Sequence, residues 1–129
     1  MIVLDTSAVM DGYFVEGLWD SFTQTLRSGT ILVPQHFDAE CLSALRRLDM
    51  RARLTDADAK AFLSFLGALP LLRIPTLKLA DAIWAKRHGM TAYDAAYVAL
   101  AESTDATLVT HDARLARSAS SVVKVRPLG

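Results

Sequence analysis

The sequence predicts an α/β fold, a three-layer α/β/α sandwich around a central, mostly parallel five-stranded sheet. Short apolar runs alternate with longer helical runs along all 129 residues, as in chains that form a parallel sheet covered on both faces. Hydrophobic residues make up 52% of the chain, which is enough for a sizeable core. No repeat, linker or low-complexity segment interrupts the alternation. We therefore expect one domain over residues 1–129.

The first part of the chain contains two predicted strands and a helix. Residues 2–4 are apolar throughout, as the central strands of parallel sheets tend to be. Residues 30–33 form the second predicted strand, which Pro34 ends. Residues 35–50 then read as a helix, because their apolar side chains share one face.

The middle of the chain predicts a second helix and a weak third strand. Thr55 and Asp58 have the spacing of a capping box, so we expect a helix to begin there and to run to about Leu69. Residues 71–74 follow as the third strand and end before Pro75.

The last part of the chain repeats the alternation. Residues 77–88 are predicted to be helical, with Gly89 as the C-terminal cap, and residues 91–103 form an apolar helix. The remaining elements are a strand over 107–110, a short helix within 111–117 and a strand over 122–125. In such sheets ligands bind beyond the carboxyl ends of the strands, where the strand order reverses.

Four acidic residues stand at positions suited to such a site. Asp5 directly follows the first strand, and Asp112 lies two residues beyond the fourth. If these strands are neighbours, the two carboxylates converge. Glu40 lies on the flank of the apolar face of its helix. Asp94 lies in the first turn of an apolar helix and faces inward, where a carboxylate needs a partner.

Each acid also has a simpler structural interpretation. Asp5 and Asp112 are suited to be helix N-caps, and Glu40 to be a solvated helix residue. Residues 91–94 match a capping box that includes Asp94. If the four acids converge instead, two unit charges ~4 Å apart repel by about 4 kcal/mol at an effective dielectric of ~20. Oxygen ligands of this kind select Mg²⁺ or Mn²⁺, which suits hydrolysis of a phosphodiester.

Four segments, in order and spacing, resemble the motifs of PIN domains. They are Val3–Ala8, Phe37–Leu45, Tyr93–Glu102 and Leu108–Leu115. The resemblance runs from Met1 to about Val125 and is strongest to single-domain bacterial VapC toxins. It implies a five-stranded parallel sheet and a Mg²⁺- or Mn²⁺-dependent endoribonuclease of a type II toxin–antitoxin pair.

The resemblance also implies roles for particular residues and partners. Asp5, Glu40, Asp94 and Asp112 correspond to the metal ligands and catalytic acids. Ser7 and Thr110 correspond to hydroxyl groups that support the metal or the scissile phosphate. The implied partners are an RNA substrate, a VapB-like antitoxin that blocks the site, and a second copy of the chain in a homodimer.

Arginines near these motifs are candidates for RNA contacts. Arg46 and Arg47 begin a basic run beside the Glu40 helix, which is either a solvated helix end or a track for phosphates. Arg114 follows Asp112 and is also within reach of a phosphate. The formal net charge of the chain is zero, so nucleic-acid binding would have to come from such local patches.

Composition limits the remaining function classes. The one cysteine, Cys41, allows neither an internal disulfide nor a cysteine-rich zinc site. The N-terminus lacks the pattern of a signal peptide, and no apolar run approaches the roughly 20 residues of a membrane span. We therefore expect a soluble cytoplasmic protein without a membrane partner.

Two other functions stay open at this point. A Rossmann-like acid phosphohydrolase also begins with an Asp at a strand end, but it needs a second Asp where this chain has Ser7. A non-catalytic, PIN-like nucleic-acid-binding module is the other alternative, and the four acids argue against it.

Overall fold

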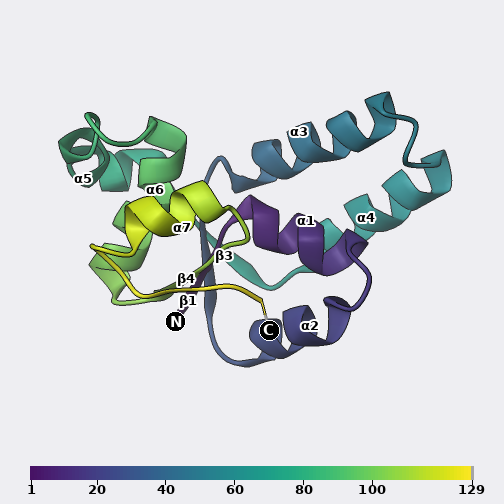
Figure 1. Cartoon of the computed structure of the whole chain (residues 1–129), viewed down its shortest axis with the longest axis horizontal. Coiled ribbons are helices and arrows are strands. Elements are labelled where there is room, and N and C mark those ends of the chain that lie inside the picture. The colour runs from purple at the N-terminus through teal and green to yellow at the C-terminus, as the bar shows by residue number, and fades with distance from the viewer. Residues whose placement is uncertain (129) are drawn as a thin grey trace.

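The computed structural model describes residues 1–128, which form one five-stranded sheet with helices on both sides (Figure 1). The strands are β1 (Ile2–Leu4), β2 (Ile31–Pro34), β3 (Leu71–Ile74), β4 (Thr107–Val109) and β5 (Val125–Arg126). Their order is β3-β2-β1-β4-β5, and every neighbouring pair is parallel. The predicted fold class is confirmed, with a sheet that is parallel throughout.

Seven helices and one 3-10 turn connect the strands within residues 1–128. They are α1 (Thr6–Phe14), α2 (Trp19–Arg27), α3 (Phe37–Met50), α4 (Asp56–Ala68), η1 (Thr76–Leu79), α5 (Ala80–Ala85), α6 (Ala92–Thr104) and α7 (Ala113–Ala119). Helix α6 packs against β1, β2 and β4, whereas α1 packs against α2 and α3. None of these helices is long and apolar enough to cross a bilayer.

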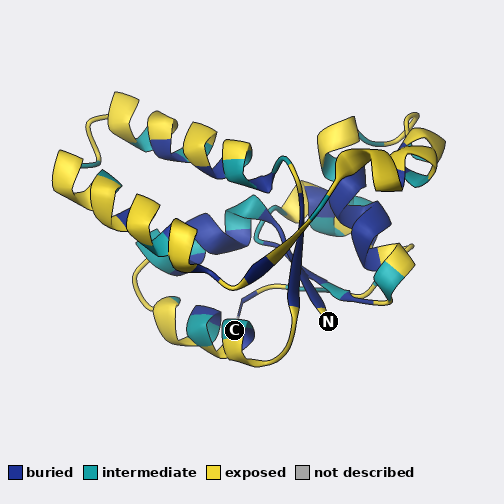
Figure 2. Cartoon of the chain, turned by 180° about the vertical axis from the view of Figure 1, so that it is seen from behind, coloured by how far each residue is buried: buried dark blue, intermediate teal, exposed yellow. Residues whose placement is uncertain are grey.

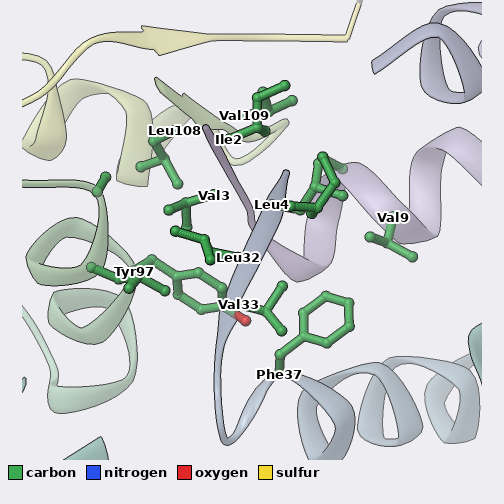
Figure 3. Packing of buried hydrophobic residues seen from close by; sticks show 14 of the residues in the cluster. Ile2, Val3, Leu4, Val9, Leu32, Val33, Phe37, Tyr97, Leu108 and Val109 are labelled. Carbon is green, nitrogen blue, oxygen red and sulfur yellow. The ribbon is translucent and has the colours of Figure 1, made fainter. Parts of the chain in front are cut away.

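The core lies between the sheet and these helices. Figure 2 shows the strands and the inward sides of the helices as buried, with the outer sides of α3 and α4 exposed. Val3, Leu4 and Leu108 on the central strands are fully buried. Figure 3 places Tyr97 on one side of these strands and Val9 and Phe37 on the other. Burial of both faces explains why β1 is apolar at every position.

The strand order fixes where a functional site can form. From β1 the chain moves to β2 and β3 on one side of the sheet, and then crosses to β4 and β5 on the other. Leu4 pairs with Val109, and the Asp5 amide donates to the Val109 carbonyl at 3.0 Å. The carboxyl ends of β1 and β4 therefore meet at the point where strand order reverses.

Helices α1 and α2 fill residues 6–27, for which the sequence predicted no element. Helix α1 buries the consecutive residues Ala8, Val9 and Met10, so it lacks the polar stripe by which a surface helix is recognised. The predicted capping box of Thr55 and Asp58 is confirmed at the start of α4.

Two predicted elements differ from the structure. The helix expected over residues 77–88 is a 3-10 turn followed by α5, and the Lys86 amide caps α5 by donating to the Ile83 and Trp84 carbonyls. Gly89 is therefore not the cap. The last strand begins at Val125, because the amides of Val122 and Val123 both donate to the Ala119 carbonyl at the end of α7.

Close packing of α1 on α2 gives a prediction of stability. A Cβ at Gly12 would lie 2.5 Å from Phe22 Cγ, whereas a Cβ at Gly67 in α4 would meet nothing within 4 Å. We expect Gly12→Ala to lower the free energy of unfolding by about 1–3 kcal/mol through overpacking. Gly67→Ala should raise it by up to about 1 kcal/mol, because alanine favours the helix. Urea denaturation measures both changes, and equal effects would contradict the α1–α2 packing.

Candidate carboxylate site

A cavity of about 680 Å³ lies beyond the carboxyl ends of β1 and β4. All four predicted acids line it: Asp5, Glu40, Asp94 and Asp112. They come from four separate elements, since they follow β1, lie in α3, lie in α6 and precede α7 respectively. The structure thus brings together residues that are up to 107 positions apart in the sequence.

Asp5 is the most buried of the four acids, with 7% of its surface exposed. The hydroxyl groups of Ser7 and Thr110 donate to Asp5 Oδ2 at 2.6 and 2.8 Å. Burial raises the pKa of Asp5 above its usual value, and the two hydroxyl groups offset part of that rise. The fold therefore disfavours the charged form of Asp5 overall, which is common for acids at ligand sites.

The loop after β4 is tied to the start of α1 by the same hydroxyl groups. The His111 amide donates to Ser7 Oγ at 2.9 Å, and the Asp112 amide donates to Thr110 Oγ1 at 3.0 Å. Ser7 and Thr110 thus both orient Asp5 and position the backbone that carries Asp112. Of the two, Ser7 lines the cavity, whereas Thr110 lies behind Asp5 and is not among the lining residues.

Asp112 caps a helix, as one interpretation of the sequence predicted, and it also lines the cavity. Its Oδ1 accepts from the amides of Arg114 and Leu115 at 2.9 and 3.1 Å and caps α7. Its Oδ2 lies 3.4 Å from the Arg114 guanidinium, on the cavity. A helix cap and a cavity-lining acid are therefore compatible at this position.

Asp94 does not complete the capping box that the sequence suggested. The Asp94 amide donates to Thr91 Oγ1 at 3.2 Å, so Thr91 caps α6. The Asp94 carboxylate turns instead to Arg114, with Oδ2 2.7 Å from Nη2, and only 15% of the side chain is exposed. Its inward orientation was predicted, but its arginine partner was not.

Arg114 is a counter-charge for two acids of the site. Its guanidinium contacts both Asp94 and Asp112, and the hydrogen bond and charge of Asp94 raise the pKa of Arg114 above its usual value. The sequence predicted Arg114 as an RNA contact. In the structure its side chain is largely exposed and pairs with the carboxylates, which reduces their mutual repulsion.

Glu40 is held by residues that sequence reasoning missed. The hydroxyl groups of Tyr97 and Thr6 donate to Glu40 Oε1 at 2.6 and 3.3 Å, and His36 Nε2 lies 3.3 Å from the same oxygen. Burial by itself would raise the pKa of Glu40, but contacts with His36 and Tyr97 outweigh it and lower the pKa. One signal was available in the sequence, because a tyrosine hydroxyl on an apolar helix needs a polar partner.

Arg46 and Arg47 have different surroundings. Arg47 lines the cavity, whereas Arg46 is not among its lining residues. Only Arg47 of this predicted pair therefore lies where a ligand of the carboxylate cavity would pass.

The donor set matches a hard divalent cation in chemistry but not in its present arrangement. Carboxylate and hydroxyl oxygens are the ligands that Mg²⁺ and Mn²⁺ prefer. Within residues 1–128, no three Asp, Glu, His or Cys side chains form a group that could hold an ion. Two of the acids are paired with Arg114, so a cation bound by all four requires that side chain to move.

Comparisons with known proteins agree with the motifs and the fold. The model of the family described as the PIN domain matches residues 2–120. Ribonuclease VapC9 of Mycobacterium tuberculosis is 40% identical over 115 residues, covering 89% of this chain and 88% of that protein. Ribonuclease VapC12 of the same species is 34% identical over 118 residues, with 92% of each covered.

A solved structure shows the same fold at lower identity. It is that of VapBC2 from Rickettsia felis bound to a DNA fragment from their promoter. It superposes with a TM-score of 0.72 and 14% identity, over 100% of both chains.

Proposed function

The chain belongs to the PIN-domain family, and from that premise we propose that it is a metal-dependent endoribonuclease, the toxin of a type II VapBC toxin–antitoxin pair. One observation carries the proposal. The four predicted carboxylates, which come from distant parts of the chain, line one cavity at the switch point of a parallel sheet, and the most buried of them accepts hydrogen bonds from two hydroxyl groups. The proposed reaction is hydrolysis of RNA phosphodiester bonds.

Asp5, Glu40, Asp94 and Asp112 are the residues proposed to hold Mg²⁺ or Mn²⁺. When bound, such a cation activates water and offsets negative charge on the leaving oxygen. The oxygen-rich lining of the cavity supports this assignment.

The other polar residues prepare these ligands. Ser7 and Thr110 orient Asp5, while Tyr97 and Thr6 orient Glu40. Because the pKa of Glu40 is lowered, its carboxylate is ionised at neutral pH and is ready to bind a cation. These hydrogen bonds hold the carboxylates in place before a ligand arrives, which lowers the cost of ordering them.

Arginines at the cavity are proposed to meet the RNA backbone. Arg47 lines the cavity, and Arg114 would be free to contact a phosphate if Asp94 and Asp112 held a cation in place of its guanidinium. Guanidinium groups suit this role because they form paired hydrogen bonds with phosphate oxygens.

The proposed partners follow from the relatives. Two relatives that align over most of this chain are named VapC ribonucleases, and a structure of similar fold comes from a VapBC complex. We therefore propose that a VapB-like antitoxin covers the carboxylate cavity, that the chain forms a homodimer, and that it acts on RNA in the cytoplasm.

Metal-dependent cleavage tests the proposal directly. The purified chain, incubated with total RNA, should produce discrete fragments in Mg²⁺ or Mn²⁺, and EDTA should stop the reaction until metal is restored. Gel analysis of the fragments measures this. Cleavage that continues undiminished in EDTA would contradict the metal mechanism. RNA binding without cleavage under any of these conditions would favour the non-catalytic alternative.

A further inference from the structure

A second cavity, of about 590 Å³, lies next to the carboxylate cavity. It is formed by α7, by the loop before it, and by β5 with Pro127, and Asp112 lines both cavities. Its volume is within the range of roughly 300–1,000 Å³ that is typical of sites for small organic ligands.

The walls of this second cavity combine apolar and basic groups. Ala113 and Ala116 of α7 face it together with Val125 and Pro127 of the C-terminal segment. Arg117 and Arg126 also line it, and within residues 1–128 neither forms an ion pair. An apolar surface with two guanidinium groups suits a ligand that has a flat apolar part and a negative charge.

Arg126 is the more buried of the two arginines. Its guanidinium donates to the Pro127 carbonyl at 3.3 Å and to the Thr25 hydroxyl at 3.5 Å, and both acceptors are neutral. The one acid of this lining, Asp112, uses its carboxylate to cap α7 and to contact Arg114. The positive charge of Arg126 therefore remains available for a negatively charged ligand.

A network of polar contacts holds the walls in place. His111 Nδ1 lies 3.2 Å from Asp11 Oδ2, and the Leu128 amide donates to His111 Nε2 at 3.1 Å. These contacts join the loop after β4 to α1 and to the C-terminal segment. The cavity is thus formed before a ligand binds, which reduces the free energy spent on ordering it.

We propose that this second cavity binds one unpaired nucleotide of the RNA, adjacent to the phosphodiester that is cut. The inference rests on the proposed function and names the feature of the substrate that the enzyme selects. The base lies on the alanine, valine and proline surface, and Arg117 and Arg126 bind its phosphate or stack on its plane.

Two variants separate the apolar contact from the charge contact. Ala116→Leu enlarges an uncharged side chain that lines the second cavity, whereas Arg117→Ala removes one guanidinium from an exposed position. Arg87→Ala is the matched control. It removes the same charge from the segment after α5, where Arg87 lies over the Trp84 ring.

The measurement is the binding of a fluorescently labelled single-stranded ribo-oligonucleotide at several salt concentrations in EDTA, so that no cleavage is needed. Ala116→Leu should weaken binding about tenfold without changing the salt dependence, because the leucine side chain occupies space that the base would fill. Arg117→Ala should weaken binding and flatten the slope of log K against log salt by about 0.7, the value for one phosphate contact on a single strand.

The results distinguish this proposal from the proposed function. If Ala116→Leu and Arg117→Ala both bind the oligonucleotide as Arg87→Ala does, the second cavity is not a nucleotide site, whatever the enzyme cleaves. Arg117→Ala is a change at the surface, so this comparison holds even if Ala116→Leu fails to fold. Absence of metal-dependent cleavage by the wild type would instead contradict the proposed ribonuclease activity. The difference in oligonucleotide binding between the variants would still test the second cavity.

Discussion

Asp5→Asn is expected to lower the rate of RNA cleavage by at least ~10²-fold, because it removes charge stabilisation worth several kcal/mol at the reacting phosphate. Asparagine keeps nearly the same shape, and its amide oxygen can still accept from Ser7 and Thr110. The change therefore removes charge while preserving the local geometry. Initial rates of cleavage in Mg²⁺ or Mn²⁺ give the measurement.

The melting temperature of Asp5→Asn tests whether a loss of activity is caused by unfolding. Since burial raises the pKa of Asp5, the folded state binds its proton more tightly than the unfolded state does. The stabilising contribution of this group is present below its unfolded pKa and is lost as pH rises through the folded pKa. Ionisation of Asp5 therefore opposes folding, and Asp5→Asn should melt in EDTA at a temperature no lower than the wild type.

A matched substitution outside the cavity tests whether loss of any negative charge is enough to lower the cleavage rate. Asp20 is exposed in the first turn of α2 and is not among the residues that line the cavity. Asp20→Asn removes the same charge and should leave the cleavage rate unchanged. Equal rates for Asp5→Asn and Asp20→Asn would show that Asp5 is not part of the reacting centre.

Asp94→Asn is expected to weaken Mn²⁺ binding at least tenfold, which removes about 1.4 kcal/mol of the stabilisation that saturating metal gives. The reason is that the substitution removes the charge of one of the four carboxylates that are proposed to hold the metal. Thermal melts in EDTA and in Mn²⁺ measure the effect as a smaller metal-induced rise in melting temperature. In EDTA the variant should be slightly less stable than the wild type, because Asp94 is paired with Arg114.

Arg114→Ala distinguishes a metal ligand from an ion-pair partner. Removing the guanidinium frees Asp94 and Asp112 from a competing positive charge, so this variant should gain at least as much from Mn²⁺ as the wild type does. If Asp94 acted only through its ion pair with Arg114, Asp94→Asn and Arg114→Ala would respond alike to the metal. That result would remove Asp94 from the proposed ligand set.

The sequence by itself predicted a parallel sheet and placed two acids just after strands, whereas only the structure showed that these strands, β1 and β4, are neighbours. Continuous apolar runs marked β1 and β4, because strands buried on both faces have no polar alternation. Asp5 and Asp112 follow those runs, and the carboxyl ends of neighbouring parallel strands lie at one edge. The start of α4 was also predictable from local sequence, because the side chains of Thr55 and Asp58 each accept a hydrogen bond from the other residue's backbone amide.

Only the tertiary structure decided which side chains meet in the site. Tyr97 reaches Glu40 across 57 positions of sequence, and Thr110 reaches Asp5 across 105. Asp94 could form a local capping box, yet its carboxylate pairs with Arg114, because α6 and α7 bring the two together. Helix α1 was missed for a related reason. It is buried by contacts with α2 and α3, and its own sequence lacks the alternation of polar and apolar faces that marks a surface helix. Local sequence sets backbone preference and strand ends, whereas the partner of a buried polar group depends on elements that meet only when the chain folds.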